Sequence, residues 1–523
     1  REYYFLSPEE FRRMIEQDEL LEWEQVYADT YYGTPRSELE RIWASGRVAI
    51  LDVDVVGGQN IKKMYPEESL AIFIMPPSID ELRARLVGRG TETPDKIDMR
   101  IAKAEREISY SKDFDVIIVN DDLDRAVGLL TQTDNHRVNV WSAKAFRAKA
   151  CLFAGQNDKA KTDLEDCIHN SGKTLEPFER YRMMFNGYDE YEFNSESFYE
   201  MANKADPTNG SAYGNQNTGS TLSLYYPPFC IAPDSTRTAM SYGNQYMHDR
   251  NLPRFGYTDA APLAEGHVLS ETKPDGSLRY SLSEEYMDQQ LAHRKKLGGW
   301  EPGEPDPRLF VCSLQPFVDS VQMTIDGVNA YRKVAQVEFN KWWEMDPNTG
   351  NDPETFYGWP VRKYNYLDGH LADATRNVAG YNIYFIRLPE IYLMYAYLLK
   401  DSDPATALEY VNKVKRRAYG YSPDGASPVD YGSLTDRTLT ADATDHLAND
   451  PLLYELWAEF FGEMRWWEDV RFLRLGKQEA DYYKTVSGPG AAKTNIVWKD
   501  TNYAMPIPTS EFESNPNPDM VQT

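Results

Sequence analysis

The 523-residue sequence has no apolar run of the length that spans a bilayer, although 41% of its residues are hydrophobic. We therefore expect a globular protein with no membrane-spanning segment. Basic residues are also scarce, with 56 Lys and Arg against 82 Asp and Glu and a net charge of −26. Because nucleic acids are bound through basic surfaces that displace counterions, this charge argues against a nucleic acid partner.

Cysteine and histidine are rare too, with four cysteines and seven histidines in the whole chain. None of them has the CxxC, Cys/His or HExxH spacing of a zinc site, so we expect no bound metal. Buried free thiols are favoured over disulfides for the four cysteines, which are Cys151, Cys167, Cys230 and Cys312.

The length of the chain exceeds what one hydrophobic core supports, and we predict more than one domain. Aromatic residues are distributed unevenly, since only Trp23 and Trp43 of the eleven tryptophans precede residue 128. The ten residues 128–137, GLLTQTDNHR, fit neither side and contain no Gly/Ser-rich or Pro-rich spacer. We therefore predict a seam at 128–137 between a first part at 1–127 and a second at 138–523.

The first part alternates predicted helices and strands. Ser7 and Glu10 have the spacing of a capping box that opens an amphipathic helix over 7–23. Apolar stretches at 48–58, 70–77 and 114–120 predict strands, and 61–68 and 79–86 predict helices. This alternation indicates a parallel α/β sheet, in which ligands bind at the carboxyl ends of the strands. Asp52, Asp54 and Asn120 occupy such ends.

Six stretches of the first part resemble guanylate kinase in order: EYYFLSPEEF, LLEWEQVY, YYGTP, ILDVDVVGG, PPSIDELRARLVGRGTET and VIIVNDD. The resemblance implies a P-loop-kinase-like α/β fold that binds GMP. Glu22 would bind the N–H edge of guanine. The residues implied to lie near the nucleotides are Tyr3, Glu22, Tyr32, Thr34, Asp54 and Asn120.

The same resemblance implies that Arg85, Arg89 and Arg100 clamp the transferring phosphoryl group, whose spread charge suits guanidinium groups. The phosphate loop GxxxxGK[ST], however, occurs nowhere in the sequence, and the family's Ser/Arg stretch for GMP phosphate has no counterpart. We therefore expect no GMP kinase activity and only marginal stability for this fragment. No cofactor is expected, because Mg²⁺ and ATP would serve only a complete kinase.

The second part is predicted to be mainly α-helical. Helical spacing of small and apolar residues predicts tetratricopeptide-like hairpins at about 138–170 and 384–418. A long, irregular, aromatic-rich insertion at about 171–380 separates them, and further helices and a proline-punctuated tail fill 450–523. Two hairpins are fewer than a free-standing solenoid needs, so we expect partner hairpins in the intact protein.

This part resembles the SusD/RagB family over about 131–523. The stretches that carry the resemblance are RVNVWSAKAFRAKACLFAGQNDKA, DPRL, VRKY, RLPEIYLMYA, ALEYVNKVKRRA, ELWAEFFGEMRWWEDVRFLRLG and AMPIPTSEFESNPNP. It implies a cell-surface, outer-membrane lipoprotein that binds oligosaccharides or polysaccharides above a SusC-like TonB-dependent transporter. The family's signal peptide, lipidated cysteine and first helical pairs have no counterpart in the sequence.

Aromatic rings with polar neighbours suit glycan binding, because sugars offer C–H faces and hydroxyl groups. Each candidate ring also fits a position in the core, and both interpretations stay open here. We further predict an ion pair between Glu463 and Arg465. The candidate glycan-binding residues are Trp300, Trp342, Trp343, Trp359 and Tyr364.

The two resemblances demand different compartments, the cell surface for glycan capture and the cytoplasm for GMP phosphorylation. Glycan binding is the favoured function, because the kinase-like part lacks its phosphate loop. Two alternatives stay open: a guanylate kinase whose missing part is supplied from elsewhere, and an artefactual chimera. Mass spectrometry of the native protein separates the chimera from a true fusion by detecting a peptide that spans Val127 to Trp141.

Overall fold

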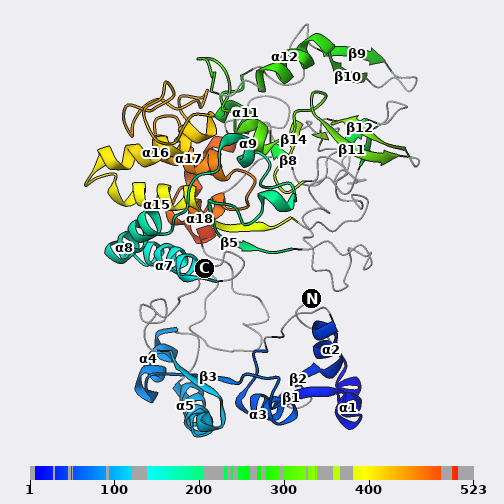
Figure 1. Cartoon of the computed structure of the whole chain (residues 1–523), viewed down its shortest axis with the longest axis vertical. Helices are drawn as coiled ribbons and strands as arrows, with labels where there is room; N and C mark the ends of the chain where they lie inside the picture. Colours follow the sequence, from blue (N-terminus) through cyan, green and yellow to red (C-terminus); the bar gives the residue numbers. More distant parts are fainter. Residues whose placement is uncertain are drawn as a thin grey trace. The chain divides into compact units, whose positions relative to one another are not determined.

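The structure of the chain is a computed structural model (Figure 1). Its described residues form two compact units, unit 1 within Arg1–Leu129 and unit 2 within Leu130–Pro506. The described residues are 6–27, 30–44, 49, 51–89, 94–120, 138–203, 229–231, 237–239, 246–248, 250–258, 268–272, 278–294, 298–325, 328–335, 337–338, 357–365, 381–484 and 498–503.

Unit 1 combines helices with two separate strand pairs. β1 and β2 are antiparallel, whereas β3 and β4 are parallel and have helices between them along the chain. The strands predicted at 70–77 and 114–120 are therefore confirmed. The elements are α1 (Pro8–Glu16), β1 (Leu20–Tyr27), β2 (Thr30–Pro35), α2 (Arg36–Ala44), α3 (Val55–Met64), β3 (Ile72–Met75), α4 (Ile79–Arg89), α5 (Pro94–Ile108) and β4 (Val116–Val119).

The predicted capping box of α1 is present. Ser7 Oγ accepts the Glu10 N–H at 3.2 Å, and the Glu10 carboxylate accepts the Ser7 N–H at 2.9 Å. The helix is shorter than predicted and ends at Glu16. Asp18 has a left-handed φ of 53°, which ends the helical path and leads the chain into β1.

The strand predicted at 48–58 is wrong for the residues that the structure describes. Asp54 is the N-cap of α3, and its Oδ1 accepts the Gly57 N–H at 2.6 Å. This bond satisfies an N–H of the first helical turn, so Val55 to Gly58 are helical and residues 51–54 are not in a strand.

Unit 2 is built around two antiparallel helical hairpins, as predicted. α7 (Val140–Phe153) and α8 (Asn157–Asn170) form the first, and α15 (Leu388–Leu399) and α16 (Pro404–Ala418) form the second. α15 packs against α8, and both α15 and α16 pack against α17 (Pro451–Phe460). Figure 1 shows the cyan first hairpin beside the yellow α15.

Small side chains allow these helices to pack closely. Ala145 and Ala148 of α7 and Ala160 of α8 are fully buried, and they join Leu393 and Ala396 of α15 in one core cluster. The hairpins therefore provide a rigid framework for the rest of unit 2.

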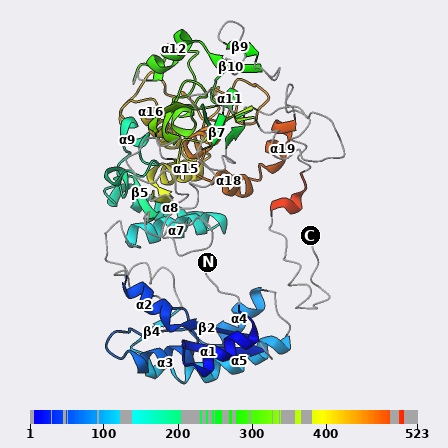
Figure 2. The same ribbon diagram turned by 90° about the vertical axis from the view of Figure 1, so that its right-hand side faces the viewer.

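The insertion is less irregular than predicted, because its described residues contain strand pairs and short helices. Figure 2 shows α12, β9 and β10 at the end of unit 2 that is distant from α7. The elements are α9 (Phe178–Tyr181), β5 (Ser197–Met201), β6 (Phe229–Ile231), β7 (Arg237–Ala239), β8 (Tyr246–His248), α11 (Asn251–Arg254), β9 (Val268–Thr272), β10 (Leu278–Leu282), α12 (Glu284–Arg294), α13 (Leu309–Cys312), β11 (Ser320–Ile325), β12 (Val328–Lys333), β13 (Val337–Glu338), β14 (Tyr357–Pro360) and β15 (Ile383–Arg387).

The carboxyl-terminal part of unit 2 contains α17, α18 (Trp466–Phe472) and α19 (Gly476–Lys484). Positive φ angles at Gly462 and Met464 separate α17 from α18. In the parts of the chain that the structure describes, no helix has the length and apolar character that crossing a bilayer requires.

Candidate functional site

Glu22 and Thr34 are brought together by the β1–β2 pair, in which they are cross-strand partners. Thr34 Oγ1 donates a 2.7 Å hydrogen bond to Glu22 Oε1. The Glu22 side chain is buried, with 5% of its surface exposed. A buried carboxylate held by a hydroxyl group is suited to accept hydrogen bonds from a ligand's N–H groups.

Asp54 lies close to Glu22, although in sequence it follows α2 and Glu22 precedes it. Its Oδ1 accepts the Gly57 N–H, and a Cβ added at Gly57 would lie 3.2 Å from Asp54 Oδ1 and 3.3 Å from Glu22 Oε2. The carboxylates of Glu22 and Asp54 therefore converge on Gly57. Three of the predicted nucleotide-binding residues thus lie together: two carboxylate acceptors and the Thr34 hydroxyl, which donates to Glu22.

Arg85 and Asn120 form a second contact. Arg85 Nη1 donates to the main-chain oxygen of Asn120 at 2.9 Å, and Arg85 Nε donates to Glu81 at 2.9 Å. This contact joins α4 to the carboxyl end of β4. Arg100 is exposed on α5. Tyr3 and the side chains of Tyr32 and Arg89 lie outside the described residues.

The three aromatic candidates of unit 2 that the structure describes lie in or against three different hydrophobic clusters. Trp359 is 3% exposed and stands edge-on to Tyr257 at a centroid distance of 5.1 Å, while Tyr364 is completely buried. Both are core residues and do not offer an exposed platform. Trp300 is partly buried, and its Nε1 donates to the main-chain oxygen of Glu304 at 3.0 Å. Trp342 and Trp343 lie outside the described residues.

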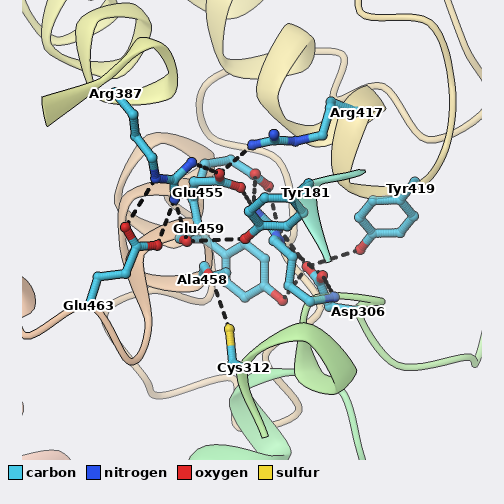
Figure 3. A network of polar contacts seen from close by, with 12 residues as sticks. Tyr181, Asp306, Cys312, Arg387, Arg417, Tyr419, Glu455, Ala458, Glu459 and Glu463 are labelled. Carbon is cyan, nitrogen blue, oxygen red and sulfur yellow. Dashed lines mark hydrogen bonds and ion pairs between the residues drawn. The ribbon is translucent and has the colours of Figure 1, made fainter. Parts of the chain in front are cut away.

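A network of buried ion pairs occupies the centre of unit 2 (Figure 3). Arg387, at the end of β15, donates to Glu459 at 2.5 Å, to Glu463 at 2.7 Å and to Glu196 at 3.0 Å. Arg417 of α16 pairs with Glu196 at 2.7 Å and also with Glu459. Each of these charges is compensated, as burial of an ion requires.

The network continues at Arg308, which makes two-pronged pairs with Asp306 and Glu455. The hydroxyls of Tyr419 and Tyr454 donate to Asp306 at 3.2 and 3.1 Å. In Figure 3 these groups converge on α17 from several segments that are distant in the sequence. The network therefore ties the insertion to the hairpins.

The members of this network have pKa values that are shifted in different directions. Burial disfavours the charged form of Glu459, yet Arg417 and Arg387 lower the pKa of this carboxyl to about 2. Burial also lowers the pKa of Arg387, but Glu463 and Glu459 outweigh it and hold the guanidinium well above its ordinary pKa. Arg387 and Glu459 therefore stay charged near neutral pH, which suits a structural ion pair. Burial raises the pKa of Glu455 above its ordinary value despite its pairing with Arg308.

The predicted Glu463–Arg465 ion pair is replaced by other pairings. Glu463 pairs with Lys363 at 2.7 Å and with Arg387, whereas Arg465 pairs with Glu390 of α15. Positive φ angles at Gly462 and Met464 turn the chain here, so the two side chains reach different partners.

A cavity of about 630 Å³ lies beside α7. Its apolar wall includes side chains that are between 38% and 57% exposed, and its charged wall includes Lys149, Arg465 and Glu468. Lys149 pairs with Glu468 at 2.5 Å. The exposed apolar residues are Phe146, Phe153, Met201, Phe385 and Met464.

The cysteines are buried and unpaired, which confirms the predicted free thiols. Burial raises the pKa of Cys312 to about 11 and those of Cys167 and Cys230 to about 12, so these thiols are poor nucleophiles. Among the described residues, no group of three or more His, Cys, Asp or Glu is arranged to hold a metal ion.

Two family models match the chain in succession. The model of the SusD family matches residues 182–523, which is more than half of the chain. The chain belongs to the SusD family. The guanylate kinase model matches residues 1–134, ahead of the SusD-family part. Both predicted resemblances, and the predicted fold class of a kinase-like α/β fragment followed by a mainly helical SusD-like domain, are confirmed.

Guanylate kinases similar to the first part come from Bacteroides fragilis and Porphyromonas gingivalis. The first is 57% identical over 125 residues, covering 24% of this chain and 61% of the relative. The second is 60% identical over 123 residues, covering 24% of this chain and 65% of the relative. The chain thus spans less than two thirds of the length of these kinases.

A solved SusD-like protein from Bacteroides fragilis is 18% identical to the chain, with a TM-score of 0.47. The match covers 75% of this chain and 67% of that protein.

Sequence reasoning missed the buried network and the cavity of unit 2. Glu455, Glu459 and Glu463 are spaced four residues apart within an otherwise apolar stretch, which is a signal for carboxylates that face a buried partner. Phe146 and Phe153, seven residues apart on α7, mark the helix face that lines the cavity.

Proposed function

We propose that the SusD-family part binds an oligosaccharide or polysaccharide at the outer-membrane cell surface, together with a SusC-like TonB-dependent transporter. The observation that carries this proposal is the family match over residues 182–523. The hairpins α7–α8 and α15–α16 would face the transporter, and the aromatic insertion would face the glycan.

Trp300 is the first ligand residue to test in this proposal. Its ring is only partly buried, and its N–H is already bonded to the main chain, so the exposed part of the ring is free for the C–H face of a sugar. Trp342 is the second residue to test, and it is chosen from the sequence alone because it lies outside the described residues. Trp359 and Tyr364 are unsuitable for such a test, because their loss would disturb the core.

Retardation of the protein in native gels that contain polysaccharides tests the proposal. We expect at least one polysaccharide to slow the chain, and the combined replacements Trp300→Ala and Trp342→Ala to weaken binding about tenfold or more. Trp467→Ala is the matched control, because Trp467 is 47% exposed and stands against Trp498. Binding that survives the double replacement in a folded protein contradicts the platform assignment.

A second candidate function belongs to unit 1, where we propose an inactive guanylate kinase remnant that still binds GMP. The convergence of Glu22, Thr34 and Asp54 favours it. The Glu22 carboxylate would accept hydrogen bonds from the guanine N–H groups. Without a phosphate loop, the electrostatic stabilisation of phosphoryl transfer is lost, so binding would persist without catalysis.

A GMP titration followed by the fluorescence of Trp23 tests this second function, because Trp23 is adjacent to Glu22 and 47% exposed. Glu22→Gln should weaken GMP binding about tenfold or more, since it removes a charge-assisted acceptor. Glu16→Gln, an exposed position on α1, is the control. ATP-dependent formation of GDP that Arg89→Ala abolishes would overturn the assignment as an inactive remnant.

A further inference from the structure

The antiparallel hairpin of β11 and β12 in unit 2 presents a polar face that carries one exposed aromatic ring (Figure 1). In its register Ser320 is paired with Lys333, and Gln322 is paired with Tyr331. Because side chains alternate along a strand, these four residues and Asn329 lie on one face. Tyr331 is 63% exposed, and Asn329 is exposed as well. We call this surface the hairpin face.

The opposite side of the hairpin is fixed to the interior of unit 2. Val321 and Val334 are completely buried in one core cluster, against which Met323 packs. The Val334 N–H donates to the main-chain oxygen of Asp319 at 2.8 Å, which closes the hairpin at its base. Val328, at the other end of β12, is 59% exposed and does not belong to this cluster. The hairpin face therefore has a buried support beneath its base.

Tyr331 differs from the other exposed aromatic side chains of unit 2, because each of those lies against a neighbouring ring at a centroid distance of 4.8 to 6.1 Å. Within the described residues, the ring of Tyr331 has no such partner, and its hydroxyl makes no hydrogen bond. A single exposed ring is ordinary on a protein surface, but an unused ring and hydroxyl on a supported hairpin suit a ligand. The exposed residues that have a ring partner are Phe146, Phe153, Phe385 and Trp467.

The groups on the hairpin face match the chemistry of a sugar. The C–H face of a sugar ring can lie on the ring of Tyr331, whose hydroxyl both donates and accepts hydrogen bonds. The amide groups of Asn329 and Gln322 offer further donors and acceptors on the same face. Their positions on paired strands hold the amides beside the ring.

Charge favours a neutral ligand on this face. None of its five residues is acidic, and its one cation, Lys333, donates to the main-chain oxygen of Val318 at 3.0 Å. Residues 128–523 carry 55 Asp and Glu against 39 Lys and Arg. Polysaccharides with uronate or sulfate groups are repelled by such a negative field, whereas neutral ones are not.

We propose that the hairpin face binds a neutral polysaccharide, with Tyr331 stacked on a sugar ring and with Asn329 and Gln322 bonded to sugar hydroxyls. The inference rests on the proposed glycan-binding function of the SusD-family part. It adds a ligand residue outside the candidates chosen from the sequence, and it names the class of the polysaccharide.

Native gels that contain a neutral glucan, mannan or galactan, or the anionic polygalacturonate, test the proposal on the full chain. At least one neutral polysaccharide should retard the chain, and polygalacturonate should not. Tyr331→Ala should weaken the neutral interaction about fivefold or more, because it removes the stacked ring. Tyr331→Phe keeps the ring and should weaken binding only about twofold. Trp467→Ala, at a 47% exposed position, should leave the affinity unchanged.

Tyr331→Thr separates loss of the ring from disturbance of the hairpin, since threonine keeps a high β propensity. It should weaken binding as much as Tyr331→Ala, with both variants folded by circular dichroism. Unchanged affinity in both variants overturns the hairpin site, and the proposed function then still stands if the combined Trp300→Ala and Trp342→Ala replacements weaken binding. Stronger retardation by polygalacturonate than by the neutral polysaccharides overturns the inferred ligand class. Absence of retardation by every polysaccharide overturns the hairpin site and the proposed function together.

Discussion

Unit 1 leaves apolar strand residues in solvent, whereas unit 2 buries charged residues completely. Ile74 of β3 is 59% exposed, and Leu393 of α15 is not exposed at all. Arg387 of unit 2 is 1% exposed and bonded to three glutamates, while the Arg83–Asp98 pair of unit 1 is largely in solvent. In these examples, the two units place an apolar side chain and an ion pair in opposite environments.

This difference shows that the burial of a side chain depends more on the elements packed around it than on its residue type. In unit 2, α17 packs against α15, α16 and α18, and its Glu455 and Glu459 are paired with the buried Arg308 and Arg387. In unit 1, the two-stranded β3–β4 sheet buries Phe73, but Ile74 on one face and Ile117 on the other are 59% and 44% exposed. Perturbing each environment tests the contrast.

The largest effect is expected from Glu459→Ala. It removes the carboxylate shared by Arg387 and Arg417 and leaves these buried guanidinium groups undercompensated, which costs about 3–5 kcal/mol. Urea unfolding of unit 2, followed by tryptophan fluorescence, measures the loss. Glu81→Ala removes the exposed partner of Arg85 and should change stability by about 0.5 kcal/mol or less. A loss below about 1 kcal/mol for Glu459→Ala would show that the network is not essential.

The second prediction compares one apolar residue from each unit. Leu393→Ala should destabilise unit 2 by about 2–5 kcal/mol, because it opens a cavity in the main core. Ile118→Ala should change the stability of unit 1 by about 0.5 kcal/mol or less, because its side chain is 45% exposed. Thermal unfolding of the two variants measures both values. Equal losses would mean that the Ile118 side chain is covered in solution.

Local patterns predicted much of this fold from the sequence. The capping box gave the start of α1, helical spacing gave both hairpins, and the apolar runs gave β3 and β4. The prediction of a strand at 48–58 was wrong because Asp54 caps a helix. An aspartate after an apolar run can mark either the end of a strand or the start of a helix, and local composition does not distinguish the two.

Long-range partners could not be predicted in the same way. Arg387 and Glu196 are 191 residues apart in sequence, and no periodicity links them. Of the candidate sites, the resemblance to a kinase placed Glu22, Thr34 and Asp54 together, whereas composition could not distinguish Trp359 in the core from Trp300 near the surface.

The third prediction concerns the pH dependence of the stability of unit 2, in which some glutamates have lowered pKa values and another has a raised one. Glu459 and Glu479 have pKa values of about 2, below the ordinary 4.5, so the unfolded state binds their protons first as pH falls. Their contribution is present above pH 4.5 and is lost as pH falls toward 2. Burial raises the pKa of Glu192 to about 7, so its contribution is present below pH 4.5 and is lost as pH rises through 7.

Glu192→Gln separates these effects, because glutamine stays neutral at all pH values. The variant should lose less stability than the parent between pH 5 and 8, by about 1 kcal/mol, since partial exposure reduces the full effect. Urea unfolding at several pH values measures the slope. An unchanged slope would assign the pH dependence in this range to other groups. The loss of stability below pH 4.5, which comes from Glu459 and Glu479, should persist in the Glu192→Gln variant.

The last prediction compares two helix caps, one in each unit, which lie in different surroundings. Ser7 and Asn139 both accept N–H groups of the first helical turn, but Ser7 is exposed and Asn139 is 1% exposed. Ser7→Ala should cost unit 1 about 0.5 kcal/mol, because water replaces the lost bond, whereas Asn139→Ala should cost unit 2 about 2 kcal/mol. Ser7→Asp is the control, since aspartate caps equally well. Urea unfolding of each unit measures the losses, and a larger loss for Ser7→Ala would contradict the dependence on burial.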